Sequence, residues 1–205
     1  MLNKVYVVDD VISKSYQDMV ENELLGQHTP WFFKKDISYN VADPRYTEKT
    51  DNARTPTLGH LFFNIEGSGV ITPGLHCMTL PIALQTFDKA GVGYGQLIKS
   101  RSFMHFPLAD ALRREHDTPH IDYDVPHLVC LYYVNDSDSD TFIFDKTLAD
   151  HHPDTSFEGI EFNTVQRISP KKGRAIIFDG TIYHASSVPT KDVRCVVNFN
   201  FMYSK

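Results

Sequence analysis

The pattern of apolar and polar residues changes its period partway along the chain. In the first part, helical spacing predicts one helix from Ser13 or Ser15 to about Leu25 and a second over residues 73–90. We expect a break near Pro81, because proline removes a helical hydrogen bond. Short strands are expected over residues 4–8, 31–37 and 58–64, and a loop over 41–57. The first part therefore indicates mixed helix and strand.

From Gly95 onward, short apolar runs alternate with turn signals. Residues 170–173 (Pro-Lys-Lys-Gly) and 179–180 (Asp-Gly) are typical of tight turns. Strands at such close spacing indicate an antiparallel sandwich or barrel. They are expected over residues 97–106, 120–123, 128–134, 141–144, 161–168, 174–178, 181–186 and 194–202. We therefore expect a single α+β domain in which residues 1–94 support a β-rich core formed by residues 95–205.

The last expected strand alternates in a way that bears on function. Successive side chains of a strand point to opposite faces. Residues 195, 197, 199 and 201 are apolar, whereas the other face carries Arg194, Val196, Asn198 and Asn200. A dry core would not hold an arginine and two asparagines, because buried polar groups without partners are costly. The polar face therefore either lines a cavity for a polar ligand or faces the solvent.

Length and charge narrow the class of protein further. The 205 residues are enough for one domain with a full core. A net charge of −6 and a pI near 5.9 give no overall attraction to nucleic acid, so duplex nucleic acid is not an expected partner. Short basic clusters at 34–35, 113–114 and 171–172 are expected in solvated turns and helix faces. No apolar run reaches the roughly 20 residues that span a membrane, and acidic residues at 9 and 10 interrupt any signal peptide, so we expect a cytoplasmic protein.

The tripeptide His-x-Asp occurs twice, at His120-Ile121-Asp122 and at His152-Pro153-Asp154. This composition supplies roughly one copy by chance, so the spacing alone carries little weight. In an extended strand, residues i and i+2 point to the same side, and an apolar run closely follows the first copy. The second copy lies in a polar, turn-like stretch. We therefore expect His120 and Asp122 to face one space, and the second copy to have no role.

His184 and Arg194 extend this pair into a candidate metal site. His184 lies in an apolar strand after a tight turn, and Arg194 begins the next strand ten positions later. Two histidines and one carboxylate leave other positions of a metal open, as in non-haem Fe(II) oxygenases. A guanidinium beside them offers two parallel donors to a carboxylate. Taken singly, each residue also fits a structural role, but the joint pattern favours a metal-dependent oxygenase.

Five stretches together resemble the Fe(II)/2-oxoglutarate dioxygenases, and within them the prolyl-4-hydroxylase-like group, which includes members carried by tailed bacteriophages. The stretches are residues 119–122, 131–136, 140–144, 170–178 and 184–194. The resemblance implies a double-stranded β-helix, the jelly-roll or cupin-like fold, with N-terminal supporting helices. It also implies Fe(II) held by His120, Asp122 and His184, with 2-oxoglutarate and O₂ as cosubstrates and ascorbate as a candidate reductant. A phage-encoded member would act in the cytoplasm of its host.

The resemblance further assigns residues to the cosubstrate. Arg194 matches the basic residue that binds the distal carboxylate of 2-oxoglutarate, and Tyr133 matches a tyrosine that supports the same carboxylate. Asn198 and Ser186 are further candidates for cosubstrate binding. Strand alternation agrees for Tyr133, which it places on the inner face, whereas Tyr132 should point outward.

One position departs from the prolyl hydroxylase pattern. Many of these enzymes carry a tyrosine just before the turn that ends the strand preceding His-x-Asp, and this chain has Phe106 there. By parity we expect Ser102 and Met104 to share the inward face with Phe106, and His105 to point away. The departure weakens the transfer of prolyl specificity but leaves cofactor use intact.

Two other functions remain open from the residues alone. A cupin-like barrel binds a metal or ligand without oxygenase turnover, and a zinc hydrolase uses the same three ligands. The hydrolase would lack a general-base glutamate, since the closest, Glu115, lies in an expected loop. The resemblance favours hydroxylation of a C–H bond in a prolyl residue of a peptide or protein; free amino acids, nucleobases and other small molecules are the alternatives. Candidate lids over the substrate are residues 41–57, 108–118 and 148–159.

Overall fold

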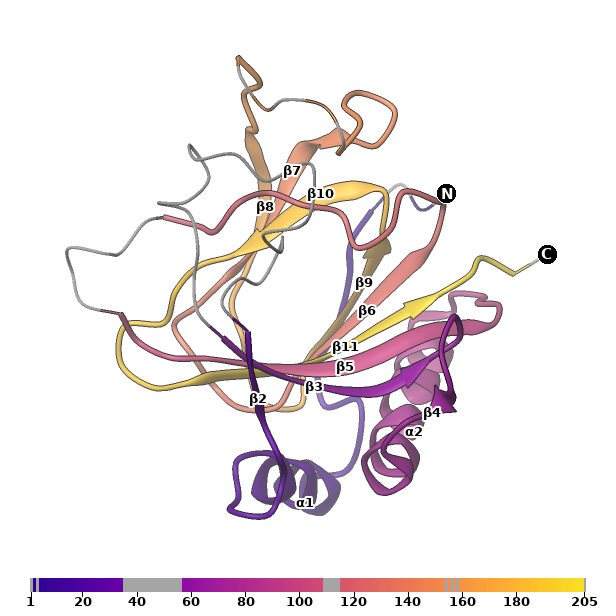
Figure 1. Ribbon diagram of the computed structural model, residues 1–205, viewed down its shortest axis with the longest axis vertical. Coiled ribbons are helices and arrows are strands. Elements are labelled where there is room, and N and C mark those ends of the chain that lie inside the picture. Colours follow the sequence, from indigo (N-terminus) through magenta and orange to yellow (C-terminus); the bar gives the residue numbers. More distant parts are fainter. Residues whose placement is uncertain are drawn as a thin grey trace.

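Two helices and two antiparallel sheets form the layers of the protein (Figure 1). The computed structural model describes residues 2, 4–34, 57–108, 115–153, 155, 157 and 159–204. The larger sheet has the strand order β1-β9-β6-β11-β5-β3-β2, with β4 paired to β3, and the smaller sheet has the order β10-β7-β8. Helices α1 (Lys14–Leu24) and α2 (Pro73–Ala90) cover one face of the larger sheet, and the smaller sheet packs on the other.

The expected strands are found, apart from one and with differences at their ends, and the structure adds a short strand over residues 69–70. The larger sheet contains β1 (Tyr6–Val8), β2 (Phe32–Lys34), β3 (Thr57–Asn64), β4 (Gly69–Val70), β5 (Leu97–His105), β6 (Leu128–Tyr133), β9 (Ala175–Asp179) and β11 (Arg194–Phe201). The smaller sheet contains β7 (Thr141–Thr147), β8 (Thr164–Ile168) and β10 (Ile182–Ser186). The strand expected over 120–123 is wrong, because only His120 forms a bridge there. Residues 41–56 of the expected loop lie outside the described residues.

Both expected helices are present, but the predicted break in the second is wrong. Helix α2 continues through Pro81 and ends at Gly91, whose φ of 64° suits glycine because it has no Cβ. Pro81 deprives the carbonyl of Cys77 of its helical partner. Cys77 is exposed, so water can donate to that carbonyl instead. Among the described residues, neither helix is both long and apolar enough to cross a membrane.

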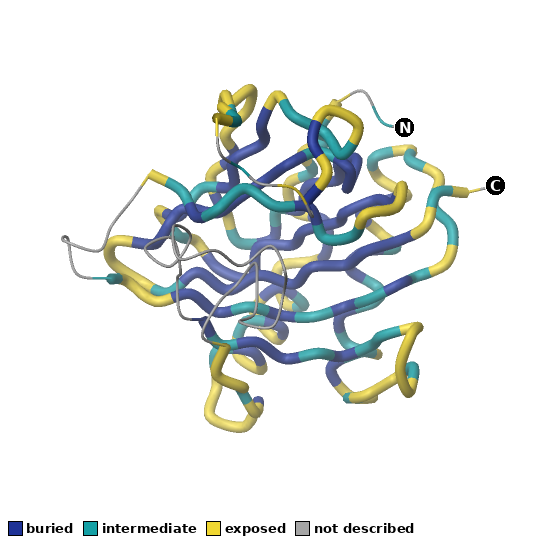
Figure 2. The backbone as a smooth tube through the Cα atoms, turned by 45° about the horizontal axis from the view of Figure 1, so that its top comes forward, coloured by how far each residue is buried: buried dark blue, intermediate teal, exposed yellow. Residues whose placement is uncertain are grey.

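An apolar layer lies on each face of the larger sheet, and β11 contributes to both. Its residues Cys195, Val197, Phe199 and Phe201 are buried in the layer beneath the helices. Its other face belongs to the space between the two sheets, where Arg194, Val196 and Asn198 line a cavity. Long stretches of the sheets are buried in Figure 2, whereas the edge strands β2 and β8 are exposed over most of their length. The alternation predicted for this strand is therefore confirmed, and its polar face lines a cavity.

Alternation along β6 is also confirmed, with one difference. Tyr133 lies in the apolar layer between the sheets, together with Val129 and Leu131. Tyr132 points the other way, as expected, but it is buried beneath the helices instead of facing water. The helical layer covers this face of the sheet, and the alternation of a strand cannot reveal such a cover.

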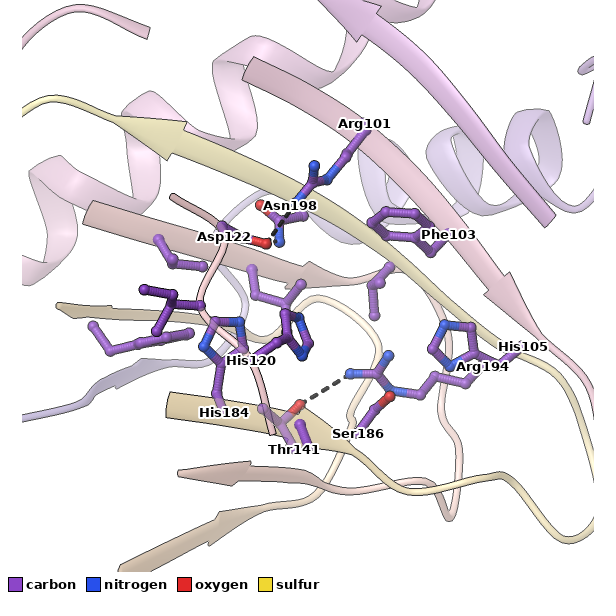
Figure 3. Close-up of a pocket in the computed structure, with 16 residues that line it drawn as sticks. Arg101, Phe103, His105, His120, Asp122, Thr141, His184, Ser186, Arg194 and Asn198 are labelled. Carbon is purple, nitrogen blue, oxygen red and sulfur yellow. Dashed lines mark hydrogen bonds and ion pairs between the residues drawn. The ribbon is translucent and has the colours of Figure 1, made fainter. Parts of the chain in front are cut away.

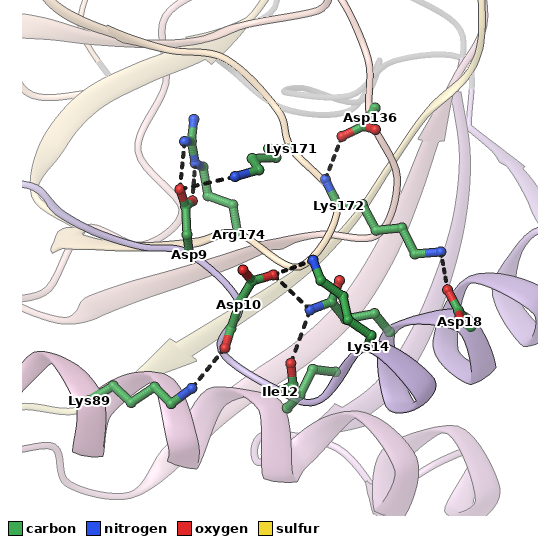
Figure 4. A network of polar contacts seen from close by, with 11 residues as sticks. Asp9, Asp10, Ile12, Lys14, Asp18, Lys89, Asp136, Lys171, Lys172 and Arg174 are labelled. Atoms are coloured by element: carbon green, nitrogen blue, oxygen red, sulfur yellow. Dashed lines mark hydrogen bonds and ion pairs between the residues drawn. The ribbon is translucent and has the colours of Figure 1, made fainter.

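A polar network fastens the N-terminal segment to the turn before β9 (Figure 4). Arg174 Nε donates to Asp9 Oδ1 over 2.6 Å, and Lys172 Nζ donates to Asp18 of α1 over 2.5 Å. Lys89 of α2 donates to the carbonyl of Asp10 over 2.7 Å. Exposed pairs of this kind contribute about 0–1 kcal/mol each. The basic cluster at residues 171–172 is thus occupied by acidic partners of the same chain.

Candidate active site

Three potential metal ligands, His120, Asp122 and His184, converge in the cavity between the two sheets (Figure 3). One ligand atom from each lies within 4.8 Å of the others. Reciprocal main-chain hydrogen bonds of 3.0 and 2.9 Å join the N–H and carbonyl groups of His120 and His184. Strand β10 thereby positions both rings, whose centroids are 4.6 Å apart. The structure thus brings together the three residues that the sequence suggested as metal ligands.

Both histidines are held in the tautomer that suits a metal ligand. Nδ1 of His120 lies 3.3 Å from the carbonyl oxygen of Thr118, and Nδ1 of His184 lies 3.0 Å from that of Ile182. Because a carbonyl can only accept, each Nδ1 carries the proton and each Nε2 keeps its lone pair. Burial, and then the neighbouring His120 ring, lower the pKa of His184 to about 4, so this ring is neutral at neutral pH.

Asp122 is held by three donors from the larger sheet. Arg101 Nη2 of β5 donates to its Oδ1 over 2.5 Å. The side-chain amides of Asn198 and Asn200 of β11 donate to its Oδ2 over 3.1 and 2.7 Å. Burial raises the pKa of this carboxyl, but Arg101 and the ligand histidines lower it more, and the net pKa lies below its ordinary value. The carboxylate is therefore ionised and fixed in orientation, as a metal ligand requires.

Arg194 lies across the cavity from Asp122, and only 3% of its surface is exposed. Its Nε donates to the carbonyl of Ser139 over 3.1 Å, and its Nη2 donates to Thr141 Oγ1 over 2.9 Å. No carboxylate among the described residues forms an ion pair with it. A buried guanidinium with neutral partners is well suited to bind a carboxylate from outside the chain.

Thr141 connects Tyr133 to Arg194. The Tyr133 hydroxyl donates to Thr141 Oγ1 over 2.8 Å, and the Tyr133 ring lies 5.7 Å from Arg194 Cζ. Thr141 Oγ1 therefore accepts from both neighbours, and its own proton remains to be donated into the cavity that Thr141 lines. Tyr133 is fully buried and does not line the cavity itself, but it contacts Thr141 and Arg194, which do.

The two further candidates for cosubstrate binding lie at different points of the cavity wall. Ser186 lines the cavity near Arg194, and its hydroxyl is 3.4 Å from Asp117 Oδ2. Asn198 lines the cavity beside Asp122, to which it donates. Ser186 thus lies at the arginine end and Asn198 at the carboxylate end.

The cavity-facing side of β5 was predicted wrongly. Arg101, Phe103 and His105 line the cavity, whereas Ser102 and Met104 lie on the helix side. The reason is the pairing with β11, which places His105 directly opposite Arg194. Phe106 follows the end of the strand and is partly exposed.

His105 is a candidate binding residue that sequence reasoning missed. Only 1% of its surface is exposed, and neither ring nitrogen has a hydrogen-bond partner among the described residues. Burial, and then the Arg194 charge, hold the pKa of His105 well below its ordinary value. It is therefore a neutral ring beside Arg194 with unused hydrogen-bonding capacity. Its pairing with the inward-facing Arg194 could have identified His105, but that pairing follows only from the register of the two strands.

The second His-x-Asp copy is only partly described by the structure. His152 is exposed, and Asp154 lies outside the described residues. Within the part of the chain that the structure describes, only His120, Asp122 and His184 form a group of at least three side chains able to hold one metal ion.

Solved structures with a similar fold include enzymes that depend on α-ketoglutarate (2-oxoglutarate) and prolyl hydroxylases. The non-haem α-ketoglutarate-dependent epimerase SnoN from nogalamycin biosynthesis has 14% sequence identity and a TM-score of 0.62, with 97% of this chain and 78% of that chain covered. A prolyl hydroxylase from Trichoplax adhaerens, in complex with a peptide of hypoxia inducible factor, has 12% identity and a TM-score of 0.55, over 98% and 84% of the two chains. No family model and no curated protein match the sequence.

A viral example is similar over almost the whole of both chains. The collagen prolyl hydroxylase of Paramecium Bursaria Chlorella virus-1, in complex with 2-oxoglutarate, has 11% identity and a TM-score of 0.50, over 99% of this chain and 98% of that one. At such low identities the likeness establishes the fold alone. The chain therefore has the double-stranded β-helix fold found in Fe(II)/2-oxoglutarate oxygenases, as the sequence predicted.

Proposed function

We propose that this protein is an Fe(II)- and 2-oxoglutarate-dependent oxygenase that hydroxylates a C–H bond of its substrate. The observation that carries this proposal is the shared cavity of the His120, Asp122 and His184 group and Arg194. A metal ligand set and a buried cation without a carboxylate partner together match a cosubstrate that chelates a metal at one end and carries a carboxylate at the other.

The donor set fits Fe(II). Two neutral imidazoles and one ionised carboxylate provide three ligands and leave other positions for cosubstrate and O₂. When bound, iron and 2-oxoglutarate supply the oxidising chemistry that amino-acid side chains lack. A zinc hydrolase is less well supported, because Asp122 is the only carboxylate among the residues that line the described cavity. A hydrolase of this kind would need a second carboxylate in the cavity to act as the general base.

The arginine end of the cavity fits the distal carboxylate of 2-oxoglutarate. Arg194 provides charge and donors, Thr141 provides a hydroxyl proton, and the neutral His105 ring provides a further donor. Tyr133 holds Thr141 in place from behind. The protein thus orients the cosubstrate, while Asn198 and Asn200 fix the Asp122 carboxylate at the metal end.

The assignment is tested by adding Fe(II) and 2-oxoglutarate to the metal-free protein without oxygen. We expect a weak visible charge-transfer band that requires both additions, followed by slow release of succinate when air and ascorbate are admitted. No band, together with tight zinc binding, would favour a cupin-like barrel without oxygenase turnover.

The substrate suggested by the sequence resemblance is a prolyl residue of a peptide or protein. Similar folds belong to two prolyl hydroxylases and to an epimerase of nogalamycin biosynthesis, so the fold is compatible with peptides and with small molecules. Succinate release screened over pools of peptides, amino acids and nucleosides separates these classes. Stimulation by prolyl peptides alone is the result expected for a prolyl hydroxylase.

A further inference from the structure

A group of basic and aromatic side chains adjoins the metal end of the cavity. Arg101 and Phe103 of β5 line the cavity, and Lys99 lies on the same face of that strand. Lys34 of β2 reaches over Gly59, where a Cβ would come within 2.7 Å of the lysine Cε, so the missing side chain makes room for it. We call Lys34, Lys99 and Arg101 the basic rim.

Aromatic rings hold the basic rim together. The Phe103 ring has Arg101 Cζ at 5.2 Å and Lys34 Nζ at 6.0 Å, and the Tyr123 ring has Lys99 Nζ at 5.2 Å. Cations at such distances are attracted by the ring faces. The contacts gather three positive heads on the cavity face of the larger sheet, with Lys34 still exposed to solvent.

The rim carries more positive than negative charge. Partial desolvation, and then the Arg101 charge, lower the pKa of Lys34 and of Lys99, while Asp122 and Glu66 act in the opposite direction on Lys99. No described carboxylate forms an ion pair with Lys34 or Lys99. Like charges that repel one another in a partly dry place are stabilised when an anion binds among them.

Asp122 does not neutralise the rim once the proposed cofactors are bound. The two positive charges of Fe(II) and that of Arg194 balance the carboxylates of 2-oxoglutarate and of Asp122. Glu66 is then the only described carboxylate that acts on the lysines from close by. Arg101 also retains a buried Nε without a hydrogen-bond partner in the described structure. The rim therefore has both charge and a donor left for a further ligand.

We infer that the primary substrate is an anion, whose carboxylate or phosphate group binds the basic rim while a nearby C–H bond lies at the metal. The inference rests on the proposed function and narrows its substrate class. An internal prolyl residue in a neutral peptide would leave the rim without a partner. A small acid, or a peptide with an acidic side chain beside the oxidised residue, would satisfy it.

The first test measures succinate release with matched pairs of candidate substrates. Two of the pairs are carboxylic acids with their amides, and phosphate monoesters with their free alcohols. The third compares prolyl peptides in which the proline is flanked by Asp or Glu with the same peptides carrying Asn or Gln instead. We expect stimulation by the anionic member of a pair and not by the neutral one; the responding pair identifies the source of the anion. Equal stimulation by both members would overturn the inference.

Variants of the rim lysines provide the second test. Lys99→Gln and Lys34→Gln are each expected to raise the KM for the anionic substrate on the order of tenfold, the loss of one charge-assisted contact. Lys4→Gln is the matched control, because Lys4 also lies over a tyrosine ring, at 4.5 Å from that of Tyr6, on the strand at the far edge of the sheet. A KM that stays unchanged in both rim variants would contradict the inference.

A third measurement requires no turnover. Sulfate is added at constant ionic strength to the anaerobic protein with Fe(II) and 2-oxoglutarate, and the midpoint of thermal unfolding is followed. We expect sulfate to raise the midpoint more in the wild type and in Lys4→Gln than in the double variant Lys34→Gln/Lys99→Gln. Equal shifts in all three proteins would show that sulfate acts generally and would count against the rim.

The outcomes separate this inference from the proposed function. A charge-transfer band combined with a preference for neutral substrates overturns the anionic substrate and leaves the oxygenase assignment standing. Absence of the band overturns the oxygenase assignment, while the sulfate shift continues to report on anion binding at the rim.

Discussion

Two arginines mark opposite ends of one cavity, and they are held in different ways. Arg194 is 3% exposed and is surrounded by hydroxyl and carbonyl oxygens, whereas the Arg101 side chain is 18% exposed and contacts the Asp122 carboxylate. The buried Asp117 carboxylate acts on the Arg194 charge, but no ion pair joins the two side chains. A deeply buried cation with only neutral hydrogen-bond partners is costly, so its retention at Arg194 favours a site completed by an external anion. Arg101 instead pairs with Asp122, a carboxylate that it would share with a bound metal ion, and it lies near the Lys99 cation. Under the proposed function, the Arg194 end would hold the cosubstrate and the Arg101 end would receive the substrate.

Removing the carboxylate that links the metal to Arg101 should have the largest effect. Asp122→Asn removes one metal ligand and leaves Arg101 without its ion pair. We expect Fe(II) affinity and turnover to fall at least about 100-fold, since even loss of an outer-shell partner costs about 10–100-fold. Affinity is measured by anaerobic titration, with Asp145→Asn, at an exposed carboxylate, as control. Unchanged iron binding would show that the group is not the metal centre.

Loss of the buried arginine should affect the cosubstrate rather than the metal. Arg194→Met is expected to raise the KM for 2-oxoglutarate about 10–100-fold, because a charge-assisted bond contributes about 1.5–3 kcal/mol. Fe(II) binding without 2-oxoglutarate should remain within about twofold. Arg167→Met is the control, since Arg167 pairs with Asp140 on the exposed side of the smaller sheet. An unaltered KM for 2-oxoglutarate in Arg194→Met would show that Arg194 does not bind the cosubstrate.

His105 tests whether the arginine end uses more than one donor. His105→Phe keeps the ring volume but removes both nitrogens, and we expect the KM for 2-oxoglutarate to rise up to about tenfold. His105→Gln, which can still donate, should recover part of the loss. If both variants behave as the wild type, His105 fills space and does not bind.

The same histidine should make stability depend on pH. Its pKa is lowered in the folded protein, so the unfolded chain binds protons first as the pH falls below about 6.5. The free energy of unfolding should therefore decrease toward lower pH, by up to about 1.4 kcal/mol per pH unit for this group. Urea unfolding of metal-free protein between pH 7 and 5 should give a shallower slope in His105→Phe than in the wild type or in the exposed-site control His28→Phe. Identical slopes would show that His105 does not titrate as a buried ring.

The sequence predicted the parts of the site that depend on local periodicity. Alternation along β11 separated Arg194 and Asn198 from the apolar core. One face of that strand packs beneath the helices, and the other lines the cavity. The grouping of His120, Asp122 and His184 was also predicted, although the first two lie on an isolated bridge and the bend after it instead of on a strand.

Features that depend on register between distant strands were not predicted. The cavity face of β5 was assigned from Phe106, which lies beyond the end of the strand, and the parity was therefore inverted. Only the pairing of His105 with Arg194, residues 89 positions apart in the sequence, shows which side chains face the cavity. Tyr132 was expected to point outward, because nothing in its strand indicates the helices that cover it.

The reciprocal main-chain bonds between His120 and His184 have a consequence for how iron is loaded. Both histidines are tied to each other by backbone atoms, so the two side chains lie close together without needing a metal between them. Many small metal domains fold only when the ion is present, because the ion itself joins their ligands. Here a chelator should withdraw iron and leave a folded protein, whose thermal unfolding midpoint falls only by the stabilisation that iron binding itself supplies. Iron supply would then regulate the activity of the proposed oxygenase without deciding whether the chain folds.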